Sequence, residues 1–245
     1  MHTRSIVLFL LASAAVVPTA SATVVVVNGD AADYHIALPE GNLPPTASAG
    51  IGGSARLGTF RETRNPPVGR ADAERRAIFQ FDLASLQPFG NTVANATFSV
   101  YLPAQASGIP THDLDLWASS DNRASAINFS DAGAIAEFDA PSYTLVFPTL
   151  IPRPTPPDLD RRYSGDITAF LQARYNDFLA NPAERYVFFR TQVEPSGAAV
   201  NSFYELNAAE AGGTVMPLLT VDVVPAPATG ALALAATLLA ARRRR

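Results

Sequence analysis

Residues 96–102 read Ala-Thr-Phe-Ser-Val-Tyr-Leu, and this alternation decides the fold class. Phe98, Val100 and Leu102 fall on one face, and hydroxyl-bearing residues fall on the other. Successive side chains of an extended chain point to opposite faces, so a period of two predicts a strand with one buried face.

Seven further stretches have strand character, and Gly, Pro, Asn and Asp separate them. They are Thr23–Val27, Arg76–Leu83, Asp113–Trp117, Tyr143–Phe147, Tyr186–Arg190, Val200–Leu206 and Leu218–Val223. No strand–helix alternation is present, which argues against a parallel α/β fold. The pattern predicts an all-β antiparallel sandwich over residues 23–224. Long loops are expected at Pro39–Ser54 and at Pro148–Pro157, the second extended and polyproline-like.

One short amphipathic helix is expected between two of these strands. Apolar residues recur at helical spacing along one face, namely Ile167, Phe170, Leu171, Tyr175, Phe178 and Leu179. Asp166 is the expected N-cap, and Asn181-Pro182 ends the element. We expect this helix to lie across an open end of the sandwich, with its apolar stripe in the core.

Composition excludes several chemistries for this chain of 245 residues. There is no Cys, so disulfides, thiol catalysis and Cys-ligated zinc are ruled out. All 18 basic residues are Arg, which rules out lysine nucleophiles and Schiff bases. Five of those Arg lie in the two ends, whereas all 22 acidic residues lie between them, so residues 23–224 carry a formal charge of −9. Such an acidic chain is not expected to bind nucleic acid.

The N-terminal residues 1–22 have the layout of a secretory signal peptide. Arg4 supplies the positive end, residues 6–17 are an apolar run, and Ala20 and Ala22 frame a cleavage site. The alternative is a buried N-terminal helix. The first interpretation predicts export through the Sec machinery.

The C-terminal residues 225–245 combine a Pro motif, an apolar stretch and an Arg cluster. Pro225 and Pro227 precede residues 228–241, and Arg242, Arg243, Arg244 and Arg245 follow. This layout resembles the PEP-CTERM sorting signal, with Ala226 in place of the motif's Glu. The resemblance implies transient membrane anchoring, processing by an exosortase, and delivery to the envelope, outer surface or extracellular matrix of a Gram-negative bacterium. A plain C-terminal anchor is the alternative.

The middle of the chain resembles the DNRLRE-type domain. Residues 76–86 form an Arg-led strand ending Phe-Asp-Leu, and residues 93–101 follow it as a second strand. The segment 165–168 and the strand 186–190 are similar to later parts of that domain, although the DNRLRE motif itself is absent. The resemblance spans about residues 30–223 and implies a jelly-roll sandwich similar in shape to carbohydrate-binding modules.

Aromatic residues are the candidates for glycan stacking. Trp117 is the only tryptophan, and its position in the alternation points it away from Leu114 and Leu116. An exposed Trp117, with Tyr143 or Tyr204 beside it, would stack on a sugar ring. The alternative is a Trp117 buried beneath loops or the helix.

Oxygen ligands after the first strand are the calcium candidates. Asn28, Asp30 and Asp33 lie in a Gly-containing turn, and Asp222 lies near the end of the last strand. The alternative is a simple polar turn.

A paired carboxylate is the one local catalytic candidate. Asp113 and Asp115 share a strand face about 7 Å apart, within the range for inverting glycosidases. The alternative is the solvent face of an amphipathic strand. The sequence therefore predicts an exported, non-catalytic matrix protein, structural or adhesive, that binds extracellular polysaccharide of a biofilm weakly. A secreted carbohydrate-active enzyme, a glycoside hydrolase or lyase, is the alternative, and a purely structural protein is a third candidate.

Overall fold

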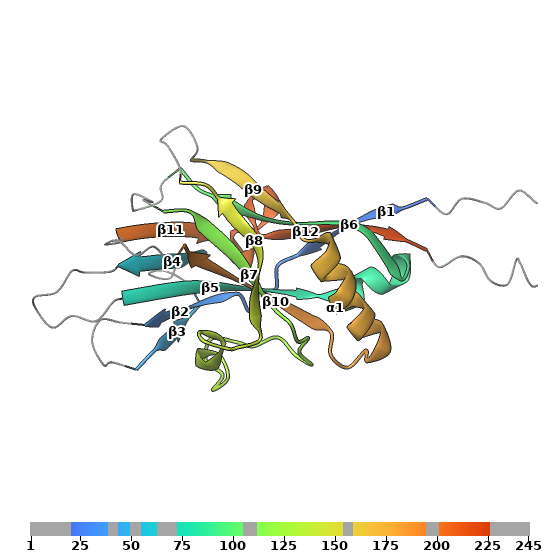
Figure 1. The fold of residues 1–245 in the computed structure, drawn as a ribbon, viewed down its shortest axis with the longest axis horizontal. Helices are drawn as coiled ribbons and strands as arrows, with labels where there is room; N and C mark the ends of the chain where they lie inside the picture. Colours follow the sequence, from blue (N-terminus) through green and yellow to red (C-terminus); the bar gives the residue numbers. More distant parts are fainter. Residues whose placement is uncertain are drawn as a thin grey trace, which may run out of the picture.

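Two antiparallel β-sheets pack face to face in the computed structural model (Figure 1), which describes residues 21–38, 44–49, 55–62, 73–104, 112–153, 159–194 and 201–225. The strands are β1 (Thr23–Asn28), β2 (Tyr34–Leu38), β3 (Thr46–Ser48), β4 (Arg56–Glu62), β5 (Ala73–Asp82), β6 (Thr92–Leu102), β7 (Leu114–Ser119), β8 (Tyr143–Ile151), β9 (Arg161–Asp166), β10 (Tyr186–Val193), β11 (Asn201–Asn207) and β12 (Leu218–Val224). The smaller sheet has the order β1-β12-β6-β9. The larger has the order β11-β4-β5-β10-β7-β8, with β2 joining β5 and β3 joining β2. The predicted all-β antiparallel sandwich is confirmed.

The core lies between the sheets and is rich in aromatic rings. Phe98 of β6 packs against Phe79, Phe81 and Phe189 of the opposite sheet, with ring centroids 5.8, 6.0 and 5.0 Å away. All four rings are fully buried. Alternation in β6 puts Val100 and Leu102 on this same buried face, as its sequence predicts.

Four strands escaped the sequence pattern: β2, β3, β4 and β9. β4 and β9 contain several charged residues, and β3 is three residues long, so these three strands show no clean alternation of apolar and polar residues. Two loop predictions need correction. β3 lies within the expected loop Pro39–Ser54, and β8 continues through Pro148 to Ile151 before the rest of the expected Pro-rich loop.

Helix α1 (Thr168–Ala180) presents the expected apolar stripe. Leu171, Tyr175 and Phe178 are buried, and the Tyr175 hydroxyl donates to the Gly90 carbonyl at 2.6 Å. The helix packs on β6 and on the 3₁₀ segment Leu83–Phe89 at one end of the sandwich (Figure 1).

The boundaries of α1 differ slightly from expectation. Ile167 holds the N-cap position, one residue later than predicted. Asp166 still accepts a hydrogen bond from the Thr168 N–H at 2.9 Å and another from its hydroxyl, and these bonds lower the pKa of Asp166. Asn181 follows the last helical residue, as expected.

A glycine allows the two sheets to approach closely beside α1. Gly165 of β9 faces the interior, where a Cβ would lie 2.8 Å from the ring of Phe147. Phe147 comes from β8 of the larger sheet. Because no side chain fits between them, this glycine allows the two sheets to approach along their β8–β9 side.

We expect Phe98→Ala to lower the free energy of unfolding by about 3–5 kcal/mol, because it leaves a cavity among three rings. Phe129→Ala is the matched control, since that ring is 46% exposed, and its cost should stay below about 1 kcal/mol. Chemical denaturation measures both. Equal losses for the two variants would contradict the central place given to Phe98.

Candidate functional site

The two outer faces of the sandwich differ in how they are covered. On the larger sheet, residues 120–142, called here the cover segment, lie over Tyr34, Ile78 and Phe188, which are fully buried. On the smaller sheet, the described residues include no such cover. Its outward side chains are Val24, Val26, Asn28, Asn95, Thr97, Ser99, Tyr101, Arg162, Ser164, Asp166, Leu218, Thr220, Asp222 and Val224, and all except Ser99 keep some exposure. We call this surface the open face.

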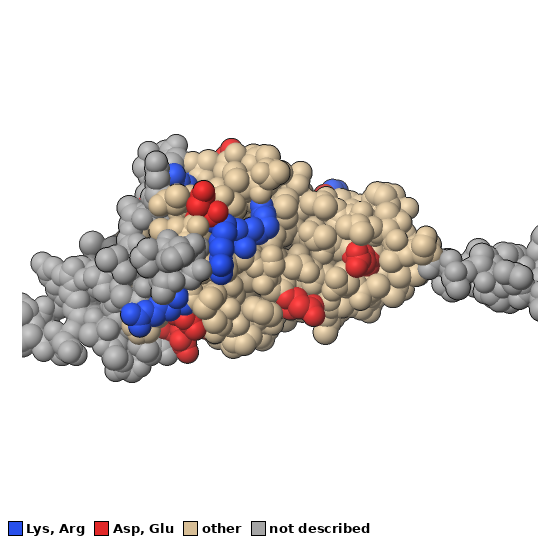
Figure 2. Space-filling model, turned by 90° about the horizontal axis from the view of Figure 1, so that it is seen from above, with Lys and Arg blue, Asp and Glu red and all other residues tan. Residues whose placement is uncertain are grey.

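The open face carries few charges. Arg162, Asp166 and Asp222 are its charged residues, and hydroxyls, amides and valines make up most of the rest. The view from above in Figure 2 shows broad uncharged areas, with basic and acidic groups beside each other in places. Arg162 is held in place, since its guanidinium donates to the Ser99 hydroxyl and the Met216 carbonyl, both at 2.8 Å. Val24 and Val26 are 64% and 54% exposed, so the β1 end of the face is apolar.

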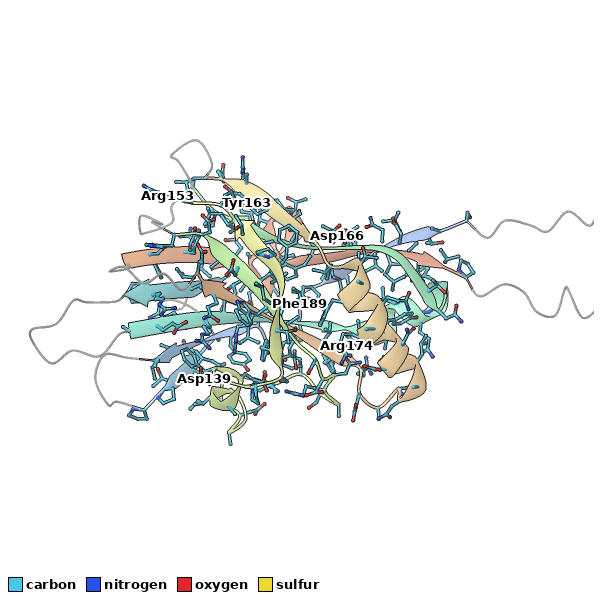
Figure 3. The ribbon with its side chains drawn as sticks, viewed as in Figure 1. Asp139, Arg153, Tyr163, Asp166, Arg174 and Phe189 are labelled. Atoms are coloured by element: carbon cyan, nitrogen blue, oxygen red, sulfur yellow. The ribbon has the colours of Figure 1, made fainter. Side chains whose placement is uncertain are left out.

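A polar hollow of about 480 Å³ lies where α1 meets the start of the cover segment. Its lining consists of Ser120, Asp121, Asn122, Arg174, Asp177, Ala180, Asn181 and Glu184. Asn122 joins the two elements by donating to the Arg174 carbonyl at 2.8 Å, and Arg174 pairs with Asp177 at 2.8 Å. In Figure 3, Arg174 lies on α1, beside this hollow.

The three aromatic candidates do not form an exposed stacking site. Tyr204 is fully buried in the core between the sheets, and its hydroxyl donates to the His112 carbonyl at 2.6 Å. Tyr143 is 5% exposed and Trp117 is half-buried, and both pack into the small core beneath the cover segment. The structure therefore brings Trp117 and Tyr143 together, separates Tyr204 from them, and corrects the expectation of exposed rings.

The calcium candidates do not converge either. β12 does pair with β1, but Asp222 lies opposite Val24 while Asn28 lies opposite Leu218, four residues along. Among the described residues, no group of three His, Cys, Asp or Glu is arranged to hold a metal ion. Asp30 binds its own turn by accepting from the Ala32 N–H at 2.9 Å. The polar-turn alternative fits this part of the chain.

Asp33 is buried within that turn. Its Oδ1 accepts from the Gln80 N–H at 2.8 Å, and a Cβ on Gly29 would lie 2.9 Å from its Oδ2. Burial raises the pKa of Asp33 well above its usual range, and the nearby carboxylates of Glu210 and Asp30 raise it further. Asp33 therefore links the start of β2 to β5, and its ionised form is destabilised by burial and by the nearby carboxylates.

Asp113 and Asp115 support the backbone of β8. Asp115 accepts from the Thr149 N–H at 2.9 Å, and Asp113 accepts from the Arg153 N–H at 2.7 Å. Thr149 has a positive φ of 55°, at an irregularity in the β7–β8 pairing. Asp115 is buried rather than on a solvent face, and burial raises its pKa. The two carboxylates thus stabilise the backbone of β8 at Thr149 and of the residues that follow β8.

Two buried arginines were not identified from the sequence. Arg76 of β5 and Arg190 of β10 lie beneath the cover segment, and both guanidiniums donate to the Phe138 carbonyl. Both belong to predicted strands, at positions of the alternation that face away from Phe79 and Phe189. That parity was the available signal, because it places both cations on the sheet face opposite the aromatic core.

Several predicted signals fall outside the described residues, including Ala20, Pro227 and Arg242–Arg245. Ala22 and Pro225 are described, and both are exposed, next to the first and last strands of the chain. No helix within residues 21–225, where described, is long and apolar enough to cross a membrane.

Comparison with known proteins yields no assignment: neither the protein-family models nor the curated proteins contain a match to this chain.

We expect Asp33→Asn to raise the melting temperature at neutral pH while leaving it unchanged near pH 3. The folded pKa of Asp33 is raised, so the folded state holds a proton that the unfolded state releases above about pH 4. Stability of the native chain is therefore lost as pH rises through that folded pKa, and the Asn variant escapes this loss. Thermal unfolding across pH 3–8 measures the difference. If calcium instead raises the melting temperature of the native chain and not of the variant, the turn is a cation site.

Proposed function

We propose that this chain is an exported, non-catalytic protein of the bacterial envelope or extracellular matrix, which holds neutral polysaccharide against the open face. The observation that carries the proposal is the uncovered and nearly uncharged outer face of the smaller sheet. The signal-peptide and PEP-CTERM-like ends, at 1–22 and 225–245, support the location.

Residue chemistry on the open face suits a neutral glycan. Thr220 lies between Val26 of β1 and Thr97 of β6, so one apolar and two hydroxyl-bearing residues lie in a row across these strands. Hydroxyl and amide groups exchange hydrogen bonds with sugar hydroxyls, while valine methyl groups cover the apolar face of a sugar ring. An extended sheet surface suits a long polymer, and its shallowness favours weak binding.

The positions of the two ends support temporary attachment. Thr23 lies opposite Val223, so the described chain starts and finishes at one end of the smaller sheet (Figure 1). A membrane tail following Pro225 would therefore hold the sandwich by that end and leave its long faces accessible. We further propose that the tail is an exosortase substrate, and that the sandwich is of the jelly-roll type implied by the DNRLRE-like segments.

A carbohydrate-active enzyme remains the second candidate because of the polar hollow. Asp121, Asp177 and Glu184 all line it, and paired carboxylates are the machinery of glycoside hydrolysis. Release of reducing sugar that is lost in Glu184→Gln would favour this enzyme over the non-catalytic role.

We expect Thr220→Glu to weaken binding of the full-length protein to neutral polysaccharide by about tenfold or more, because a second carboxylate then lies beside Asp222 in the middle of the face and loses water on binding. Thr144→Glu is the matched control, since Thr144 is an exposed strand residue of the larger sheet. Affinity electrophoresis in gels containing the polysaccharide measures both. Unchanged retardation of Thr220→Glu, or equal weakening in the control, would contradict the proposed face.

A further inference from the structure

Arg190 is a buried cation held only by backbone carbonyls. Its side chain leaves β10 toward the cover segment, and the residue is 4% exposed. Nη1 donates to the carbonyls of Glu137 at 3.2 Å and of Phe138 at 2.5 Å. Nε, which is also buried, has no hydrogen-bond partner.

The charge of Arg190 is not balanced by a direct ion pair. Its neighbour Arg76 pairs with Glu74 at 2.8 Å and with Asp139 at 3.1 Å. No carboxylate of the described residues forms such a pair with Arg190. Burial lowers the pKa of Arg190 to about 10, and the positive charge of Arg76 lowers it as well. Proteins seldom bury a charge in this way unless it is paired or used.

Aromatic rings surround this cation. The guanidinium carbon lies 4.3 Å from the centroid of Tyr143 and 5.7 Å from that of Trp117. The indole N–H of Trp117 is buried without a hydrogen-bond partner. A free donor, a cation and two ring faces thus meet on the outer surface of the larger sheet, beneath the cover segment.

The cover segment is attached mainly by hydrogen bonds: Gln80 exchanges two with the backbone of Ile127, and Arg123 and Tyr186 exchange two between their backbones. Its apolar contacts are fewer. Ala134 and Phe138 are its fully buried apolar residues in the small core, whereas Phe129 and Ile135 are 46% and 40% exposed. Glu137 contributes an ion pair with Arg123 at 3.3 Å, and both of these residues belong to the cover segment itself. Opening therefore exposes little apolar surface, and it exchanges hydrogen bonds to the sheet for hydrogen bonds to water.

We propose that the sheet surface beneath the cover segment is a closed binding site for a carboxylate-bearing sugar, and that the Phe138 carbonyl takes the place of the sugar's carboxylate. When the cover segment opens, Glu137, Asp139 and Arg123 move away with it. Arg76, Arg190, Trp117 and Tyr143 stay on their strands, and Glu74 stays paired with Arg76. Arg190 is then a free guanidinium, whose planar donors match a carboxylate.

Chemistry at the site favours a sugar acid over a simple anion. A sulfate or phosphate needs only the guanidiniums, whereas Trp117 and Tyr143 offer ring faces and a free N–H to a pyranose. The inference deepens the proposed polysaccharide binding by naming an acidic component. It uses a different surface from the open face, so the two proposals fail separately.

Trp117 makes the test direct, because it is the only tryptophan of the chain. Titration of the full-length protein with sodium oligogalacturonate should change its tryptophan emission saturably, with the same dissociation constant by calorimetry. Neutral galacto-oligosaccharide should give no such change. Arg190→Gln should weaken oligogalacturonate binding at least tenfold, while Arg153→Gln, which removes an exposed Arg far from the cover, should not.

A second variant separates binding from a merely structural role of Arg190. Phe138→Ala removes the ring that packs 4.0 Å from the Arg76 guanidinium, so the cover opens more easily and the apparent affinity should rise. Opposite shifts in Phe138→Ala and Arg190→Gln, both with cooperative thermal unfolding, support the site. Absence of a response in the native chain, an equal response to sodium sulfate alone, or equal weakening in both variants would overturn it.

Discussion

The packing of Phe98 between the sheets is the interaction on which the rest of this structure depends. Phe98 is the one ring of the smaller sheet that meets Phe79, Phe81 and Phe189 of the larger sheet. Burial of these aromatic surfaces supplies much of the free energy that holds two separate sheets together. Helix α1 joins the same cluster, because Phe170 packs on Phe189 with centroids 5.7 Å apart. Each outer face is positioned by this contact.

The two outer faces then take different roles for a physical reason. The larger sheet presents Tyr34, Ile78 and Phe188 outward, and such apolar residues need a cover, which residues 120–142 supply. The smaller sheet presents hydroxyls and amides outward, so water can remain its partner. The covered face also buries two cations, since Arg76 and Arg190 share it with Ile78 and Phe188 along β5 and β10.

Much of the fold was predictable from local patterns, and less of the candidate site was. Alternation in β6 and β7 correctly placed Phe98, Leu114 and Leu116 inward. The same parity placed Trp117 on the opposite face but said nothing of the cover above it. Tyr204 was misjudged because exposure depends on which strands lie opposite β11. The calcium hypothesis rested on Asn28, Asp30 and Asp33 in one turn. Its fourth candidate, Asp222, depended on the β1–β12 register, which separates it from Asn28 by four positions.

The sequence by itself determined the class of the fold, the buried faces of β6 and β7, and the apolar stripe of α1. These features follow from periodicity, capping residues and composition, all of which act over a few neighbouring residues. Tertiary structure alone decided which face is covered, which strands are neighbours, and that Arg190 meets the Phe138 carbonyl across 52 positions of the chain. Such contacts join residues far apart in sequence, and only the packing of the whole core brings them together.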